Sequence, residues 1–361
     1  MIKLIKPSIS FDSVEHELKE IFKSGQFTQG KNVEIFENSL KKYLNVEYIG
    51  LTTSATTALS LSLRVMGIKQ GDKVAVSDYS WPASSNVIEE IGATPIFIDV
   101  NPETFNMCPK DLTKKINSDV SAVIFVDTFG NPSGIEEINK ICKKYKIPIL
   151  EDAACALGSE INEIKVGAYS DITCFSFHPR KVLNTGEGGA IATNNKDYSD
   201  LFKVKLAAGA SRKAEVGLDF TDYGFNFRMT EIQALMGWKQ LLELDNYVEK
   251  RKLIKEEYIS QLKGHDFIPQ KINKNVYHNC QSIVFKVPEN LSRNELVNYL
   301  FKKNIESTLG TYCLSGTKFN QQKYDDVQKN SSYIDSIAIT LPCYSGIDTL
   351  KVTDEIISFI S

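Results

Sequence analysis

Residues 148–158 read PILEDAACALG, and the fold class follows from this stretch. An apolar run that ends at Leu150 passes directly into Glu151 and Asp152, and very small residues follow. Such a run is typical of a buried strand, and the ligands of open α/β sheets bind at the carboxyl ends of their strands. We therefore expect an acid that points into a crevice with room for a flat ligand. The alternative is that either carboxylate only caps the next helix.

Short β-rich runs alternate with helical patterns on both sides of this stretch. The β-rich runs are Tyr48–Leu51, Lys73–Val76, Pro95–Val100, Ala122–Val126, Ile147–Leu150, Ile172–Phe177 and Gly189–Thr193. The helical patterns lie near residues 55–66, 82–92 and 134–145. This alternation predicts an α/β fold in which helices flank a mainly parallel central sheet.

The pattern changes after about residue 265. The apolar spacing between Met229 and Leu262 predicts one long linker helix. A strand, a helix over Arg293–Lys302, a short strand and a closing helix follow it, which is the pattern of a small α+β domain. We expect a large domain over residues 1–265, including the N-terminal segment and the linker helix, and a small C-terminal domain over residues 266–361.

The charge balance and the cysteines limit the possible partners. The 361 residues carry 42 basic and 45 acidic side chains, and a net charge of −3 offers no basic surface to nucleic acid or an anionic membrane. No uncharged apolar run reaches the roughly 18 residues of a membrane span. The seven scattered cysteines never form a C-x-x-C pair, which argues against a disulfide framework and against zinc. We expect a cytoplasmic protein with no nucleic-acid, membrane or metal partner.

Residues 52–59, TTSATTAL, place small hydroxyl residues at a strand-to-helix junction. Free backbone amides and the helix dipole make such a junction a site for an anion, and small side chains let a phosphate approach. A plain N-cap is the alternative reading of the same residues.

Residues 174–181, CFSFHPRK, end in a lysine beside the glycine-rich turn of residues 182–190, VLNTGEGGA. Burial and neighbouring charge can make an amine at such a place nucleophilic, so Lys181 is a candidate for covalent catalysis. Most single lysines are solvated surface residues, which is the alternative here.

Residues 78–86, DYSWPASSN, form another strand exit and carry Trp81. An aromatic side chain at the mouth of a crevice can stack on a planar ring. The alternative is that Trp81 anchors the core.

The chain resembles the DegT/DnrJ/StrS group of sugar-nucleotide aminotransferases. The resemblance rests on the order of four motifs: a hydroxyl turn, an aromatic residue, a buried acid and a lysine. The resemblance extends almost from end to end and includes KP at 6–7, FTQG at 27–30, GATP at 92–95, FGNP at 129–132, GFNFRM at 224–229 and LPCY at 341–344. It implies the fold of a fold-type I transferase that depends on pyridoxal 5′-phosphate.

The resemblance also implies roles for single residues. Lys181 would be the Schiff-base lysine, and Asp152 would pair with the pyridine nitrogen of the cofactor. Trp81 would stack on the ring. The 3′ oxygen would meet Cys155, where members of the group usually have Gln or His; a thiol is a weaker donor, so the tuning of the ring remains open.

The phosphate of the cofactor would be held by four residues on two chains. Ala55 through its backbone, Thr56 through its hydroxyl and Ser176 would bind it from one subunit. Asn226 matches an asparagine that reaches the phosphate from the neighbouring subunit, which implies a homodimer with shared active sites.

The reaction implied by the resemblance moves an amino group from L-glutamate to a keto group of a nucleotide-linked sugar. We expect C4 of a 4-keto-6-deoxyhexose, for an amino sugar of a surface polysaccharide or glycan. The segment 207–211, AAGAS, replaces a more basic sequence near the sugar nucleotide, so the identity of the sugar stays open. The alternatives are a 3-keto sugar aminotransferase, a sugar dehydratase or lyase on the same fold, and a non-catalytic regulator that binds the cofactor. The dehydratases have histidine in place of the lysine, so Lys181 argues against that branch.

Overall fold

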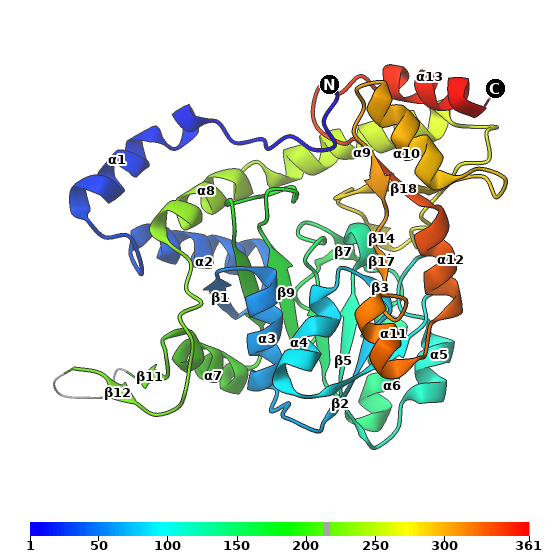
Figure 1. Ribbon diagram of the computed structural model, residues 1–361. Coiled ribbons are helices and arrows are strands. Elements are labelled where there is room, and N and C mark those ends of the chain that lie inside the picture. Colours follow the sequence, from blue (N-terminus) through cyan, green and yellow to red (C-terminus); the bar gives the residue numbers. More distant parts are fainter. Residues whose placement is uncertain (212–216, 361) are drawn as a thin grey trace.

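The computed structural model describes residues 1–211 and 217–360 (Figure 1). Within these ranges the central sheet has seven strands. In their order across the sheet they are β1 (Tyr48–Thr52), β10 (Gly189–Thr193), β9 (Ile172–Ser176), β6 (Ile149–Asp152), β5 (Val120–Val126), β2 (Lys73–Ser77) and β4 (Thr94–Ile98). The last five are parallel to one another, whereas β10 is antiparallel to both β9 and β1. The predicted mainly parallel sheet is confirmed, and β10 brings its first residue to the edge where the parallel strands end.

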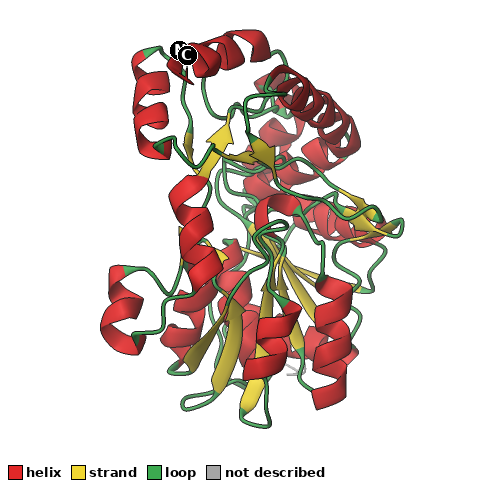
Figure 2. Cartoon of the chain, turned by 90° about the vertical axis from the view of Figure 1, so that its right-hand side faces the viewer, coloured by secondary structure: helices red, strands yellow, loops and turns green. Residues whose placement is uncertain are grey.

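Helices cover both faces of the sheet (Figure 2) because the strand side chains alternate between two apolar layers. One face packs against α3 (Ala55–Val65), α4 (Ala83–Ile91) and α7 (Lys196–Leu206). The other face packs against α2 (Lys31–Leu44), α8 (Glu231–Leu241), α5 (Pro109–Lys115) and α6 (Ile135–Tyr145). On β6, Leu150 lies in the first layer and Ile149 in the second. Because successive strand residues point to opposite faces, Asp152 lies on the side of α3 and α4, and Glu151 on the side of α6.

The segment predicted as one linker helix is two helices, which corrects the sequence interpretation. The first helix, α8, ends at Leu241, and α9 spans Leu244–Gln261. Helix α8 and the first half of α9, with Leu244 and Val248, pack beside α2 in the large core, whereas the second half of α9 packs into the core of the C-terminal part. The apolar pattern looks continuous because Leu241 and Leu244, on either side of the break, belong to the same buried cluster.

The C-terminal part contains an antiparallel sheet in the order β13 (Ile268–Pro269), β15 (Ile283–Lys286), β18 (Ala338–Leu341) and β16 (Thr308–Leu309). Two helices, α10 (Arg293–Lys302) and α13 (Thr349–Ile360), share its apolar cluster with α9. The first residues of the chain also lie here: Ile2 forms a parallel bridge with Ile305, and the carbonyl of Leu4 accepts the N–H of Cys343 at 3.0 Å. Both ends of the chain therefore lie in the C-terminal part, at the top of Figure 1. The division at residue 265 stays a prediction.

The remaining elements are short helices, two-residue strands and the ten-residue helix α1. They are η1 (Phe11–Ser13), α1 (Glu15–Ser24), β3 (Tyr79–Ser80), η2 (Thr128–Gly130), β7 (Glu160–Ile161), β8 (Ile164–Lys165), β11 (Ala210–Ser211), β12 (Asp219–Phe220), β14 (Val276–Tyr277), β17 (Tyr312–Cys313), α11 (Lys318–Tyr324) and α12 (Lys329–Ile337). Among the helices of the described ranges, none has both the length and the apolar character needed to cross a membrane.

Candidate active site

One edge of the central sheet brings most of the predicted site residues together. Asp152 ends β6, Ser176 ends β9, and these two strands are neighbours. Gly189 begins β10 and pairs with Ser176 on one side and with the last residue of β1 on the other. Helix α3 follows β1 and begins with Ala55 and Thr56. Residues far apart in the sequence thus meet at the carboxyl edge, where open α/β sheets bind their ligands.

The junction between β1 and α3 combines a helix cap with two free amides. Ser54 Oγ accepts the N–H of Thr57 at 3.1 Å, and Thr57 Oγ1 accepts the N–H of Ser54 at 3.1 Å. The plain-cap interpretation is therefore correct for these two hydroxyls. In the described chain no group accepts a hydrogen bond from the amides of Ala55 and Thr56, which lie at the positive end of the helix. These amides fit an anion such as a phosphate.

Glycine at position 189 keeps this junction close to β10. A Cβ added to Gly189 would lie 2.5 Å from the carbonyl carbon of Ser54 and 2.7 Å from the amide nitrogen of Ala55. A side chain there would push the junction away from Ser176, which is buried at the end of β9. The close approach of three backbone segments makes a narrow cradle beside the free amides.

Asp152 is a buried carboxylate, and each of its oxygens accepts a hydrogen bond. Its Oδ2 accepts the hydroxyl of Ser84 at 2.6 Å, and its Oδ1 accepts the N–H of Ala154 at 3.2 Å. Burial raises the pKa of Asp152, while these hydrogen bonds and the charge of Lys181 act in the opposite direction. The described residues after Asp152 form turns and the short strands β7 and β8, so the helix-cap interpretation is wrong. A cationic ring nitrogen would be a suitable partner for this carboxylate.

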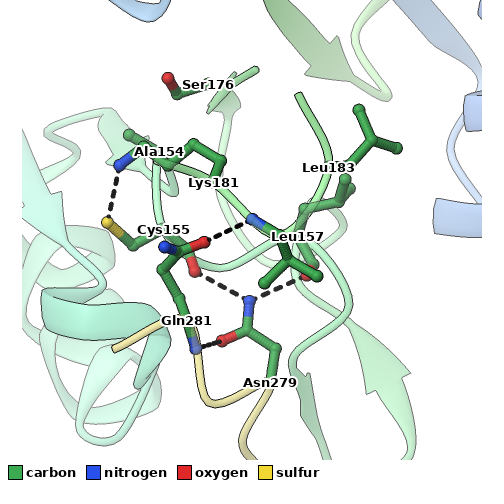
Figure 3. A pocket seen from close by; sticks show the side chains of 9 residues that line it. Ala154, Cys155, Leu157, Ser176, Lys181, Leu183, Asn279 and Gln281 are labelled. Carbon is green, nitrogen blue, oxygen red and sulfur yellow. Dashed lines mark hydrogen bonds between the residues drawn. The ribbon is translucent and has the colours of Figure 1, made fainter. Parts of the chain in front are cut away.

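Lys181 directs its amine into a small pocket that Cys155 and Ser176 also line (Figure 3). The Nζ of Lys181 donates to the Sγ of Cys155 at 3.0 Å. No carboxylate of the described residues forms an ion pair with Lys181. The solvated-lysine interpretation is therefore wrong, because this amine is half-buried and lies beside a thiol.

Trp81 lies just before the N-terminus of α4 and not in the core. Its side chain is 63% exposed, and its ring meets the edge of Tyr312 with the ring centroids 5.8 Å apart. The core-anchor interpretation is wrong. Ser84, one turn further on, bonds to Asp152, so Trp81 lies near the same site. Stacking of Trp81 on a ligand ring stays a prediction.

Asn226 lies in a segment that runs beside the junction of β1 and α3. The N–H of Thr53 donates to the carbonyl of Phe227 at 2.8 Å, and Arg228 forms an antiparallel bridge with Thr52. The side chain of Asn226 is exposed. The predicted contact of Asn226 with the site of a second subunit stays a prediction, because the structure describes a single chain.

Four side chains of the site were missed from the sequence: Ser84, Asp127, Asn279 and Gln281. Ser84 lies within the motif of residues 78–86, but nothing in the sequence distinguishes it from the neighbouring serines as a partner of Asp152. Asn279 and Gln281 come from a loop about 100 residues beyond Lys181, as the 99-residue separation of the bond between Val182 and Gln281 shows. Only the three-dimensional arrangement could reveal them.

Asp127 directly follows β5 and forms a buried carboxyl pair with Glu151, the residue before Asp152. Asp127 is 1% exposed, and neither of its oxygens has a hydrogen-bond donor among the described residues. Burial, followed by the charges of Glu151 and Asp152, raises the pKa of Asp127 well above its usual range. Glu151 accepts the hydroxyl of Thr173 at 2.8 Å through one oxygen only. A proton on Asp127 would supply the donor that the other oxygen lacks.

We expect the Asp127→Asn variant to become more stable than the wild type as pH rises. The folded chain keeps a proton on Asp127 that the unfolded chain releases above a pH near 3.8, so rising pH favours unfolding of the wild type through this group, and the variant lacks that contribution. The gap in the free energy of unfolding grows by up to about 1.4 kcal/mol per pH unit through this window. Urea denaturation at pH 5 and pH 8 measures it. The matched control is Asp354→Asn on an exposed face of α13; equal pH slopes for the two variants would contradict the assignment.

The groups at the sheet edge fit pyridoxal 5′-phosphate. They comprise an amine in a pocket, a buried carboxylate on the neighbouring strand, and a narrow cradle with two free amides for a phosphate. The donor set matches the chemistry of that cofactor: a primary amine for its aldehyde, an anion for its ring nitrogen and N–H donors for its phosphate.

Comparison with known proteins agrees with this fit. A model of the DegT/DnrJ/EryC1/StrS aminotransferase family matches residues 11–360. The chain is 30% identical over 323 residues to GDP-perosamine synthase of Escherichia coli O157:H7, covering 90% of this chain and 88% of that protein. It is 35% identical over 259 residues to UDP-4-amino-4,6-dideoxy-N-acetyl-beta-L-altrosamine transaminase of Campylobacter jejuni, covering 71% and 68% of the two chains.

A solved structure extends the likeness to the whole fold. The PLP form of the sugar aminotransferase Spr1654 from Streptococcus pneumoniae superposes with a TM-score of 0.92 and is 26% identical. The match covers 99% of this chain and 97% of that one. The resemblance found in the sequence is therefore confirmed by sequence and by structure.

Proposed function

Because the chain belongs to the DegT/DnrJ/EryC1/StrS aminotransferase family, we propose that it moves an amino group from L-glutamate to C4 of a nucleotide-linked 4-keto-6-deoxyhexose. The chain is a sugar aminotransferase that depends on pyridoxal 5′-phosphate and serves amino-sugar synthesis. One observation carries the assignment: the amine of Lys181 points into a pocket at the end of β9, beside the strand that ends in Asp152. The name of the Campylobacter relative includes a 4-amino sugar, which supports C4.

The cofactor would be held by residues from several strand ends. Lys181 would bind its aldehyde covalently, and Asp152 would face its pyridine nitrogen. The amides of Ala55 and Thr56, together with the Thr56 and Ser176 hydroxyls, would bind its phosphate. When bound, the ring supplies an electron sink for the electron pair released at the Cα of the amino donor.

The protein's own groups would then handle protons and charge. Asp152, held by Ser84 and by the N–H of Ala154, stays ionised opposite a protonated ring nitrogen. The free amine of Lys181 takes the proton from Cα of L-glutamate and holds it at Nζ. Cys155 lies 3.0 Å from that nitrogen and so limits where the amine can move between proton transfers. Trp81 would cover the ring at the mouth of the site.

A homodimer in the cytoplasm is part of the proposal. Asn226 is exposed and lies near the phosphate cradle of its own chain, so a second chain packed against this segment would receive Asn226 at its own cradle. All seven cysteines are free thiols, which suits a reducing compartment. The product is proposed to serve as an amino sugar of a surface polysaccharide or glycan.

The test of the proposal is a substrate panel. The purified protein is incubated with pyridoxal 5′-phosphate, L-glutamate and GDP-, UDP- or dTDP-linked 4-keto and 3-keto sugars, and products are read by mass spectrometry. We expect an amine on a 4-keto sugar and 2-oxoglutarate in equal amount. Amination of 3-keto sugars only would contradict C4, and loss of water or cleavage without amination would identify a dehydratase or lyase. Bound cofactor without any turnover on the panel would favour the non-catalytic regulator.

A further inference from the structure

A four-residue segment, His278–Gln281, reaches from the start of β15 into the active site. Its side chains bind the backbone of three different loops of the large core. His278 Nε2 lies 3.0 Å from the carbonyl of Phe129, and the Asn279 and Gln281 side chains contact the loops that carry Cys155 and Lys181. All four residues are buried. We call this segment the clip.

Gln281 brackets Lys181 on both sides. Its Nε2 donates to the carbonyl of Arg180 at 2.7 Å, and its Oε1 accepts the N–H of Val182 at 2.9 Å. One planar amide thus fixes the residue before Lys181 and the residue after it. The loop that carries Lys181 lies outside regular secondary structure, and among its other backbone bonds is the one from the Lys181 N–H to the carbonyl of His178 at 2.8 Å. The direction in which the lysine leaves the backbone therefore depends on Gln281.

Asn279 fixes the opposite wall of the pocket. Its Nδ2 donates to the carbonyl of Cys155 at 2.8 Å and to that of Leu157 at 2.9 Å (Figure 3). Gly130 makes room for it, since a Cβ at that position would lie 2.1 Å from the Oδ1 of Asn279. The turn that carries the thiol is therefore held by the clip and not only by its own strand.

The two amides of the clip are joined to each other and to helix α9. The N–H of Gln281 donates to Oδ1 of Asn279 at 2.9 Å. Arg251, a buried residue of α9, donates from Nη1 to the carbonyls of Cys280 and Gln281, both at 3.1 Å. The positions of the Lys181 and Cys155 loops are thereby set by one connected unit, which is in turn anchored to α9.

We propose that Asn279 and Gln281 are positioning residues that set the geometry between the Lys181 amine and the Cys155 wall of the pocket. The proposal rests on the proposed function, in which Lys181 binds the cofactor and transfers the proton. A displacement of about 1 Å at a reacting group costs about 10²-fold in rate, so the backbone of this lysine needs support on both sides. The clip gives that support through bonds to the backbone on both sides of Lys181 and at Cys155.

The test compares three variants of the full-length protein. Gln281→Leu removes both bonds that bracket Lys181, and Gln281→Glu keeps the acceptor for Val182 but loses the donor to Arg180. The matched control is Gln270→Leu: Gln270 is also buried, and its Nε2 donates to the carbonyls of Thr104 at 2.7 Å and Thr128 at 3.0 Å, away from Lys181. Any general cost of removing a buried glutamine appears in both leucine variants.

Two readouts separate positioning from folding. The first is the rate at which added pyridoxal 5′-phosphate becomes fixed on Lys181 by borohydride, measured by peptide mass. The second is hydrogen exchange of the backbone around residues 178–185 in the cofactor-free protein. We expect Gln281→Leu to slow fixation about tenfold or more and to speed exchange, Gln281→Glu to lie between it and the wild type, and Gln270→Leu to match the wild type. In turnover, kcat should fall in Gln281→Leu while KM for the nucleotide sugar stays close to that of the wild type.

The outcomes are distinguishable. Equal fixation rates and equal exchange for Gln281→Leu and Gln270→Leu would overturn the role of the clip while leaving the proposed function intact. Failure of the wild type to fix the cofactor on Lys181 would overturn the proposed function itself. A large rise of KM with unchanged kcat in Gln281→Leu would also overturn the positioning role, because it would place Gln281 in substrate binding.

Discussion

Replacing Lys181 with alanine removes the covalent attachment of pyridoxal 5′-phosphate and lowers the rate of transamination by at least about 10³-fold. The same amine has two tasks in the proposed mechanism, since it binds the cofactor and carries the proton at Nζ. In the structure its hydrogen-bond partner is the thiol of Cys155 at 3.0 Å, and no carboxylate forms an ion pair with it among the described residues, so alanine breaks no salt bridge. We therefore expect the loss of activity without a loss of fold.

The measurement combines borohydride reduction, peptide mass and the glutamate half-reaction. The thermal midpoint of the cofactor-free variant should lie close to that of the wild type. As a control, Lys303→Ala removes a lysine whose ion pair with Glu355, at 2.9 Å, lies on the surface, and it should keep full activity. Reduced cofactor found on another lysine of the wild type would show that Lys181 is not the attachment site.

The second large effect is expected from Asp152→Asn, which should leave the cofactor attached but slow transamination by about 10²- to 10⁴-fold. Asparagine has nearly the same size, and its oxygen can still accept the hydroxyl of Ser84, which lies 2.6 Å from Asp152 Oδ2. What is lost is the negative charge that keeps a ring nitrogen protonated. The effect should therefore appear in kcat, with the extent of cofactor attachment unchanged.

Glu151→Gln provides the matched control for this variant. Glu151 is the preceding residue of β6, it is equally buried, and it points to the opposite face of the sheet. Its amide would still accept the hydroxyl of Thr173, so the fold keeps that bond. Transamination should survive in this variant, as measured with saturating L-glutamate. Comparable losses in both variants would mean that the effect comes from losing any buried carboxyl near the sheet edge and that Asp152 has no specific partner.

The sequence predicted the layers of the molecule better than their details. The alternation of β-rich and helical runs is a local property, and it gave the helices and parallel strands of the large core. The antiparallel direction of β10 depends on how the chain returns after Lys181, which no periodic pattern records. The break between α8 and α9 was missed because apolar residues of both helices belong to one buried cluster, so the apolar pattern continues across it.

The order of the motifs along the chain predicted part of the site. The long-range contacts that complete the site could not be predicted from the sequence. Lys181, Asp152 and the junction at Ala55 each follow a strand, and a strand end is visible in a sequence. Gln281 has no such mark, since a single glutamine in a loop looks like any polar residue. Its role depends on meeting a backbone segment 101 residues away, as in its bond to Arg180, and only the fold brings the two together.

The bridge between Ile2 and Ile305 has a consequence for the order in which the newly made chain folds. Synthesis proceeds from the N-terminus, so the first residues leave the ribosome long before the strands near residue 305 exist. They must remain without this partner until residue 305 has been made. Contacts that span such a long stretch of chain form late. Ribosome-bound chains that stop before residue 305 are therefore expected to expose the first residues to protease, and protection should begin only when the C-terminal sheet is complete.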